Sequence, residues 1–154
     1  MSDVTIEIAG VKHKMRALRK FFEGNRQLLE QIGVFASQQI IKRTMSGRDY
    51  NNRLFKPYSP QYAIARQNAG RPANPVDLFF TGRMQAAMTH KTETDPPGVR
   101  LFFSAPQQGM IAAAHHYGLG RLRNAKREFF AINDDDRKYI TAMLSEGLRA
   151  ITEE

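Results

Sequence analysis

The chain contains no cysteine among its 154 residues. Disulfide bonds, thiolate metal ligands, cysteine nucleophiles and CxxC redox chemistry are therefore excluded. The sequence also has no run of about 18 apolar residues, the length that a membrane-spanning helix needs. Residues 1–10 lack both a basic segment and an apolar stretch. We therefore expect neither a membrane span nor a secretory signal, and we expect synthesis in a cytoplasm.

Acidic residues are scarce in two segments of a basic chain. Lys and Arg number 23 against 15 Asp and Glu, which gives a net charge of +8. Residues 47–74 hold five basic residues and one acidic residue, and residues 107–127 hold four basic residues and no acidic one. Residues 128–154 reverse the sign, with seven acidic residues against three basic ones. This polarity favours association with nucleic acid or an acidic protein surface, and ordinary solvated loops are the alternative.

The overall composition is typical of a folded globular chain. Hydrophobic residues make up 42% and charged residues 25%, close to the average for such proteins. The length fits one compact domain, so we predict a single domain over residues 1–154.

The first third of the chain predicts a strand and a long helix. Residues 4–8 alternate apolar and polar side chains, which is typical of a half-buried strand. Residues 12–22 and 25–45 have helical spacing, and the second stretch carries a broad apolar face. Gly47 ends this helix. Residues 46–60 are rich in Gly, Asp, Asn and Pro, so we expect an exposed loop or arm there.

The middle of the chain predicts short helices and a hairpin. Ser59 and Pro60 can cap and begin a helix that runs to about Asn68. A second short helix is expected at residues 83–88. Two β-prone stretches, 89–94 and 99–104, flank Asp-Pro-Pro-Gly, which indicates a β-hairpin with a four-residue connection.

The last third predicts a helix, a basic loop, a strand and a final helix. Residues 110–116 form an Ala-rich helical stretch that Gly118 ends, and an exposed basic loop covers residues 118–127. The aromatic stretch 128–132 predicts a short strand. Asn133 caps a last helix that has three aspartates in its first turn and an apolar stripe along one side, so we expect this helix to pack in the core.

These elements predict an α+β fold. It is a single domain with a long N-terminal helix, a β-hairpin or small antiparallel sheet, and a C-terminal helix.

No residue pattern in the chain indicates catalysis or a cofactor. His115 and His116 are adjacent, so on a helix they point about 100° apart, and no metal-ligand partner lies at the required spacing. The Gly118-Leu-Gly120 sequence follows a helix and lacks a third glycine, so a turn explains it better than a phosphate loop. We therefore expect no enzyme activity, no metal and no cofactor.

Several segments, taken in order, resemble the virion morphogenesis or tail-completion proteins of tailed bacteriophages. The resemblance covers roughly residues 25–152. It lies in the long helix followed by Phe55-Lys-Pro-Tyr-Ser-Pro60, Val76-Asp-Leu-Phe-Phe-Thr-Gly-Arg-Met84, Ala114-His-His-Tyr-Gly118 and Arg127-Glu-Phe-Phe-Ala-Ile132. Near the last motif the family has a proline where this chain has Asn124-Ala125.

The resemblance implies a structural, non-enzymatic virion protein at the head-to-tail junction, in the neck or at the top of the tail. It implies assembly in the host cytoplasm as a homo-oligomeric ring, such as a hexamer, beside connector and tail-terminator or tail-tube proteins and close to genomic DNA. Two alternatives from other classes remain open. One is a sequence-independent nucleic-acid-binding protein, and the other is an assembly factor that is absent from the finished virion.

This function predicts two sets of site residues. The candidates for contact with the DNA passage or an acidic neighbour are Arg121, Arg123, Lys126 and Arg127, followed by Arg48, Arg53 and Lys56. The candidates for a subunit-interface loop are Phe55, Pro57 and Tyr58. Because aromatic residues do not alternate with the basic ones, the pattern does not indicate readout of a base sequence.

Overall fold

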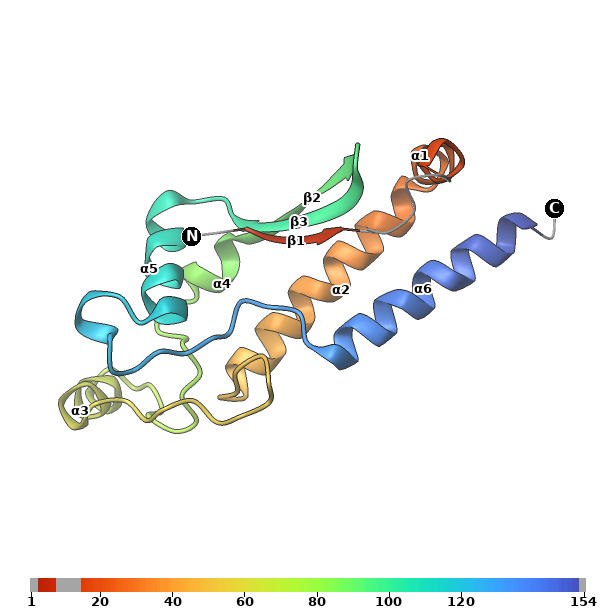
Figure 1. Cartoon of the computed structure of the whole chain (residues 1–154). Coiled ribbons are helices and arrows are strands. Elements are labelled where there is room, and N and C mark those ends of the chain that lie inside the picture. The colour runs from red at the N-terminus through yellow and green to blue at the C-terminus, as the bar shows by residue number, and fades with distance from the viewer. Residues whose placement is uncertain (1–2, 8–14, 153–154) are drawn as a thin grey trace. The chain divides into compact units, whose positions relative to one another are not determined.

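The structure, a computed structural model, describes residues 3–7 and 15–152 and has an α+β fold (Figure 1). Its elements are β1 (Val4–Glu7), α1 (Met15–Gly24), α2 (Arg26–Met45), α3 (Pro60–Asn68), α4 (Arg83–Ala87), β2 (Met88–Thr94), β3 (Pro97–Phe103), α5 (Pro106–Tyr117), the 3-10 helix η2 (Gly120–Leu122) and α6 (Asp134–Thr152). The predicted fold class, with its long helix, small antiparallel sheet and C-terminal helix, is confirmed. Among the described residues, no helix has both the length and the apolar character to cross a membrane.

The chain folds into two compact units whose segments alternate along the sequence. The helical unit consists of residues 38–88 and 103–131. The sheet unit consists of the described residues up to 37, residues 89–102 and the described residues from 132 on. The prediction of one domain over residues 1–154 stays a prediction.

The sheet unit contains a three-stranded sheet in the order β1-β3-β2. Strand β1 runs antiparallel to β3, with Val4 opposite Leu101 and Ile6 opposite Val99. The predicted hairpin is confirmed, although β3 already begins at Pro97, so the connection is shorter than the expected four residues. The first strand is confirmed over residues 4–7. Its expected last residue, like the expected start of the first helix at residues 12–14, lies outside the described residues.

In the sheet unit, α6 runs antiparallel to the first part of α2 (Figure 1). Phe35 stacks on Tyr139 with ring centroids 4.4 Å apart. Further along the pair, a Cβ on Gly147 would lie 2.7 Å from Leu28 Cδ2, so the leucine side chain would have to move to admit a larger residue. On the predicted apolar stripe Ile140 is buried. The stripe is covered only in part, because residues 143 and 144 are half-buried and residue 148 is exposed.

The N-terminus of α6 has the cap that the sequence predicts. Asn133 Oδ1 accepts a hydrogen bond from the Asp136 backbone N–H at 2.8 Å. In return, Asp136 Oδ2 accepts the Asn133 N–H at 3.3 Å. This reciprocal arrangement satisfies two of the backbone donors that a helix start leaves without partners.

In the helical unit, the start of α3 also follows the prediction. Ser59 Oγ accepts the Tyr62 backbone N–H at 3.3 Å, and Pro60 occupies the first helical position. The helix ends before Gly70, whose φ is +69°. The predicted helix at residues 110–116 is confirmed and begins four residues earlier, at Pro106.

The expected strand at residues 128–132 is wrong, because the segment has no regular strand structure. Two of its backbone N–H groups bond to nearby carbonyls, Phe129 N to Arg127 O at 2.9 Å and Ala131 N to Phe129 O at 3.1 Å, and the Phe130 N–H bonds to a side chain of α5. Both Phe129 and Phe130 are buried. The aromatic residues that suggested a strand therefore serve as core residues of an irregular segment.

Candidate functional site

The two loops that the sequence marks as basic lie side by side in the helical unit. Lys56 Nζ donates to the Asn124 carbonyl at 3.2 Å. The Tyr50 backbone N–H donates to Glu128 O at 2.9 Å. These contacts join residues 46–60 and 118–128 into one surface, called here the basic surface. Its members, all exposed, are Arg48, Arg53, Lys56, Arg121, Arg123 and Lys126.

The cations of this surface differ in how far they are neutralised. Lys126 pairs with Glu128 at 2.8 Å. Arg48 donates to the carbonyl oxygen of Asn52 at 2.7 Å. The side chains of Arg53, Arg121 and Arg123 make no ion pair or hydrogen bond with any described residue. These three arginines are therefore the members of the basic surface most open to an anionic partner, and Arg121 and Arg123 lie close together in the chain.

Arg127 is a correction to the predicted set, because its side chain is only 2% exposed. Its guanidinium donates to Lys56 O at 3.3 and 3.1 Å and to Pro57 O at 3.2 Å. It also lies 5.2 Å from the centre of the Tyr58 ring. Burial lowers the pKa of Arg127 from its usual value. The residue therefore ties the two loops together from inside and is not available to DNA or to a neighbouring protein.

The predicted interface residues also differ in exposure. They are Phe55, Pro57 and Tyr58. Phe55 is buried, so it belongs to the core of the unit and not to a subunit interface. Pro57 is exposed. Tyr58 is half-buried, and its hydroxyl accepts the Leu78 backbone N–H at 3.1 Å. Burial raises the pKa of the Tyr58 phenol, so it stays protonated at neutral pH.

A second buried arginine, Arg66, organises the neighbouring segment. Its Nη2 donates to Asp77 Oδ1 at 2.8 Å and to Phe79 O at 3.1 Å, and its Nε donates to Pro72 O at 2.8 Å. The guanidinium carbon lies 4.7 Å from the centre of the Tyr58 ring. The burial of Arg66 could not be predicted from the sequence, where it is one of the five basic residues of segment 47–74, because no local signal distinguishes an arginine whose partner lies eleven residues further on.

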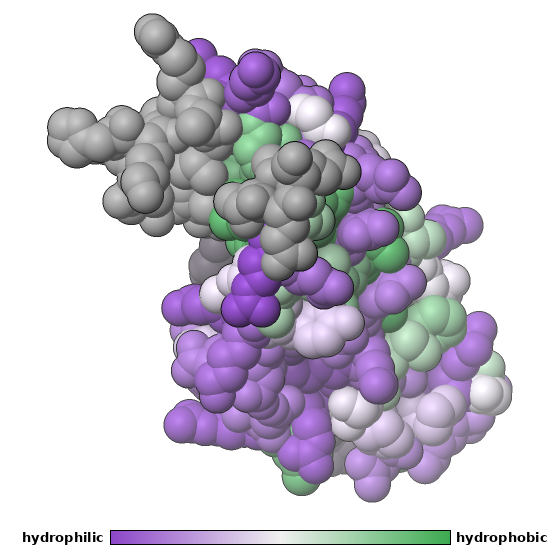
Figure 2. Space-filling view, turned by 90° about the vertical axis from the view of Figure 1, so that its right-hand side faces the viewer, coloured by the Kyte–Doolittle hydropathy of each residue, from purple (hydrophilic) through white to green (hydrophobic). Residues whose placement is uncertain are grey.

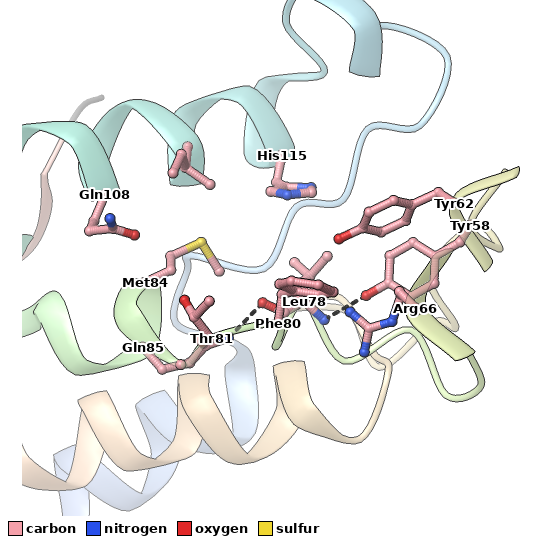
Figure 3. Close-up of a pocket in the computed structure, with 12 residues that line it drawn as sticks. Tyr58, Tyr62, Arg66, Leu78, Phe80, Thr81, Met84, Gln85, Gln108 and His115 are labelled. Carbon is pink, nitrogen blue, oxygen red and sulfur yellow. Dashed lines mark hydrogen bonds between the residues drawn. The ribbon is translucent and has the colours of Figure 1, made fainter. Parts of the chain in front are cut away.

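A cavity of about 240 Å³ opens beside Arg66, between α3, α4 and α5 (Figure 3). Gln108 and His115 line it from α5, and Met84 and Gln85 line it from α4. All of its lining residues belong to the helical unit. No sequence pattern indicates this cavity, because its lining comes from three helices and a connecting segment that are separated along the chain.

Two buried polar atoms of the cavity lining lack partners. Gln85 is 8% exposed, and its Nε2 donates to Leu78 O at 2.9 Å. Its Oε1 has no hydrogen-bond partner among the described residues, and the same holds for His115 Nδ1. Burial, with a smaller contribution from the positive charge of Arg127, lowers the pKa of His115 to about 4. The imidazole is therefore neutral at pH 7.

The backbone beside the cavity is strained at Leu78, whose φ is +51°. A non-glycine residue in the left-handed region costs about 1–3 kcal/mol and is most often found at functional sites. Here the Tyr58 hydroxyl and the Gln85 amide hold the Leu78 peptide groups from both sides. The cavity wall is thus fixed by named side-chain contacts.

Neither histidine lies in a metal centre formed by described residues, which contain no group of three His, Asp or Glu side chains able to hold an ion. His116 Nδ1 instead accepts the Phe130 backbone N–H at 3.2 Å. Burial lowers the pKa of His116 as well. His116 therefore has a structural role as a hydrogen-bond acceptor, and His115 lines the cavity.

Hydrophilic residues cover most of the face seen in Figure 2, with hydrophobic residues in small patches between them.

Comparison of the chain with models of known protein families, with curated proteins and with solved structures finds no match in any of the three. The fold and the site thus define an α+β protein that presents a basic surface and, beside it in the helical unit, an aromatic-lined cavity.

Proposed function

We propose that this chain is a structural virion protein at the head-to-tail junction of a tailed bacteriophage, where it helps to join the tail to the DNA-filled head. The observation that carries the proposal is the basic surface. Two segments about 70 residues apart contribute six exposed cations to it, and the side chains of three of these, Arg53, Arg121 and Arg123, have no partner among the described residues.

A basic surface of this kind suits a protein that surrounds or faces DNA without reading its sequence. Phosphate contacts need positive charge and fix position, whereas sequence readout needs side chains that reach base edges. The basic surface contains arginine and lysine side chains on irregular loops and no aromatic stacking platform. It therefore fits non-specific contact with genomic DNA or with an acidic face of a neighbouring virion protein.

The motifs that resemble the phage family support the proposal by their mutual contacts. Tyr58 of the first motif bonds to Leu78 of the second, and Arg127 of the last motif bonds to the carbonyls of Lys56 and Pro57. Segments that are far apart in sequence thus form one framework. Such contacts are what we expect if the motifs were selected together to hold the basic loops in place.

The proposal also includes the absence of enzyme activity and the formation of a homo-oligomeric ring. Many large apolar side chains stay exposed in the helical unit, among them Leu54, Ile64, Met110 and Leu119. These side chains are available for contacts with further copies of the chain or with partner proteins.

The test is the double variant Arg121→Ala/Arg123→Ala in virion assembly. We expect the melting temperature to stay nearly unchanged, because both side chains are exposed, and the yield of joined, DNA-filled particles to fall. The matched control is Arg137→Ala/Lys138→Ala, which removes two exposed cations from α6. Full infectivity of the Arg121/Arg123 variant, or an equal loss in the control, would overturn the proposed role of the basic surface.

The alternatives give different results in two further experiments. A sequence-independent nucleic-acid-binding protein would bind DNA tightly without other virion proteins, and its affinity would fall steeply with added salt. A non-virion assembly factor would be absent from purified virions analysed by mass spectrometry. Presence in the virion, with an image of its position and copy number at the neck, is the result expected for the proposed function.

A further inference from the structure

We propose that the basic surface of the helical unit binds the phosphate backbone of duplex DNA without reading its sequence. This inference rests on the proposed virion function and deepens it, because it chooses DNA over an acidic face of a neighbouring protein. The distribution of charge over the whole helical unit carries this choice.

The positive charge of the chain is concentrated in the helical unit. Residues 38–88 and 103–131 hold 12 basic and 3 acidic residues, which is a net charge of +9. The rest of the chain holds the other 11 basic and 12 acidic residues, which is a net charge of −1. The net charge of +8 therefore comes from one of the two units.

Most of the basic side chains of this unit are exposed. Three are buried, namely Arg43, Arg66 and Arg127. The other nine are exposed, and they are the six members of the basic surface together with Lys42, Arg71 and Arg83. The unit thus presents a large excess of positive charge to its surroundings.

The three acidic residues of the unit are half-buried, and each is already engaged inside the unit. Asp49 Oδ1 accepts two backbone N–H groups of its own loop, at 2.8 and 2.9 Å. Asp77 pairs with Arg66 at 2.8 Å, and Glu128 pairs with Lys126 at 2.8 Å. The helical unit therefore has no carboxylate that is both exposed and unbound.

A surface of this composition fits a ligand that carries no positive charge. Duplex DNA has one negative charge per about 1.7 Å of its axis and no cation. A partner protein carries both signs of charge, and a protein interface matches them in complementary pairs. The helical unit has no free carboxylate to offer the cations of such a partner, so DNA fits it better than a protein face does.

The two loops of the basic surface are also held in place before any ligand binds. The side chains of Arg127 and Lys56 each donate to carbonyl groups of the opposite loop. Arg53, Arg121 and Arg123 are exposed on these loops, and their side chains have no described partner that DNA would have to displace. Guanidinium groups bind phosphate oxygens in bidentate pairs, so these three arginines are the expected first contacts.

Contact with phosphate groups alone gives weak binding that added salt weakens further. Non-specific binding of this kind has a Kd of about 10⁻⁴ to 10⁻⁶ M at physiological salt. Between three and six cations of the basic surface can reach phosphates, so log K should fall against log salt with a slope of about −3 to −5. Weak binding by the isolated chain also differs from the tight binding expected of an independent nucleic-acid-binding protein.

The experiment measures binding of the full chain to two duplexes of unrelated sequence, each of about 30 base pairs, by fluorescence anisotropy between about 50 and 200 mM salt. We expect equal affinity for the two duplexes and the slope given above. No binding at the lowest salt, or a clear preference for one sequence, would overturn the proposal. Polyglutamate of equal charge is the comparison ligand, and if it bound as tightly as the duplexes, an acidic protein face would replace DNA as the partner.

Variants locate the binding on the basic surface. Arg121→Ala/Arg123→Ala should reduce the size of the slope by about 2, because each lost phosphate contact removes about one released counterion. Arg121→Lys/Arg123→Lys keeps both charges and should keep the slope. The matched control, Arg137→Ala/Lys138→Ala, removes two exposed cations from α6 and should leave the slope unchanged. An equal reduction in the control would show a response to net charge alone and would overturn the assignment to the basic surface.

The DNA measurement and the virion experiment can fail separately. If the Arg121/Arg123 alanine variant loses DNA binding but retains full infectivity, the proposed virion role of the basic surface is overturned and the DNA contact stands. If the native chain does not bind DNA but the same variant lowers the yield of joined particles, this inference is overturned and the proposed function stands.

Discussion

Arg66 and Asp77 form an ion pair of 2.8 Å in the helical unit, with side chains that are 1% and 14% exposed. The same Asp77 oxygen accepts the Phe79 backbone N–H at 2.9 Å and lies 3.4 Å from the Tyr58 hydroxyl. One carboxylate thus joins α3 to the segment that forms the wall of the cavity. The pair therefore fixes the position of this wall relative to α3.

Replacing Asp77 by Ala should destabilise the protein by about 3–5 kcal/mol, because it leaves the Arg66 charge buried without its partner. The measurement is the free energy of unfolding from urea titration. The control is Arg71→Ala, since Arg71 is exposed and lies 5.6 Å from the Phe79 ring centre. That change should cost about 1 kcal/mol or less. Similar losses for the two variants would mean that the ion pair contributes little to stability.

Replacing Arg127 by Ala should destabilise the protein, whereas replacing Arg121 should not. Loss of the buried Arg127 guanidinium removes its hydrogen bonds to the Lys56 and Pro57 carbonyls, and hydrogen bonds to a charged group contribute about 1.5–3 kcal/mol each. Arg121 is exposed, so its change should stay within about 0.5 kcal/mol. Thermal melts of both variants test this difference. An Arg127→Ala variant that melts like the native chain would return Arg127 to the exposed basic residues.

The helix boundaries could be predicted from the sequence because their signals are local. Ser59 and Asn133 cap helices through hydrogen bonds to residues three positions away, and such spacing is visible in the chain itself. Glycine after a helix likewise marks a left-handed residue, as at Gly118. The fold class followed from these elements.

The site could be predicted only in part because its decisive contacts are long-range. Arg121 and Arg127 lie in the same basic segment, and nothing in the sequence around them tells them apart. Arg121 is exposed, whereas Arg127 bonds to carbonyls about 70 residues earlier. Arg66 has no local signal for burial either. The aromatic stretch at 128–132 has β propensity, but propensity does not reveal that its N–H groups bond to nearby carbonyls and to the His116 side chain.

Stability should fall on the acid side because of His115. Burial lowers the pKa of this histidine from 6.5 to about 4 in the folded chain. Between those values the unfolded chain binds more protons than the folded chain, so the free energy of unfolding decreases as pH falls through this window. Above about pH 6.5 the contribution of His115 is constant, and the lowered pKa of His116 acts in the same direction.

The variant His115→Gln should reduce this acid-side loss. Each unit of pKa change corresponds to about 1.4 kcal/mol, and partial exposure of His115 brings the expected difference to about 1–3 kcal/mol at the acid end. Urea titrations across the window, for the native chain and the variant, measure the two slopes. An identical pH dependence for both proteins would exclude His115 as the cause.

Replacing Gly118 by Ala should cost more than replacing Gly70 by Ala, although both glycines have nearly the same backbone conformation. Their φ angles are +68° and +69°, so an alanine at either position carries the same left-handed cost of about 1–2 kcal/mol. A Cβ on Gly118 would lie 3.2 Å from Leu122 O and from Lys126 Cβ, whereas a Cβ on Gly70 has nothing within 4 Å. We expect the tight contact to add about 1–3 kcal/mol at Gly118, because the basic loop must shift to admit the methyl group. Urea titration of the two variants isolates this contact, since the conformational cost cancels in their difference. If the two variants unfold at the same urea concentration, the loop after α5 yields to the methyl group without cost and is not held at a fixed distance from the helix.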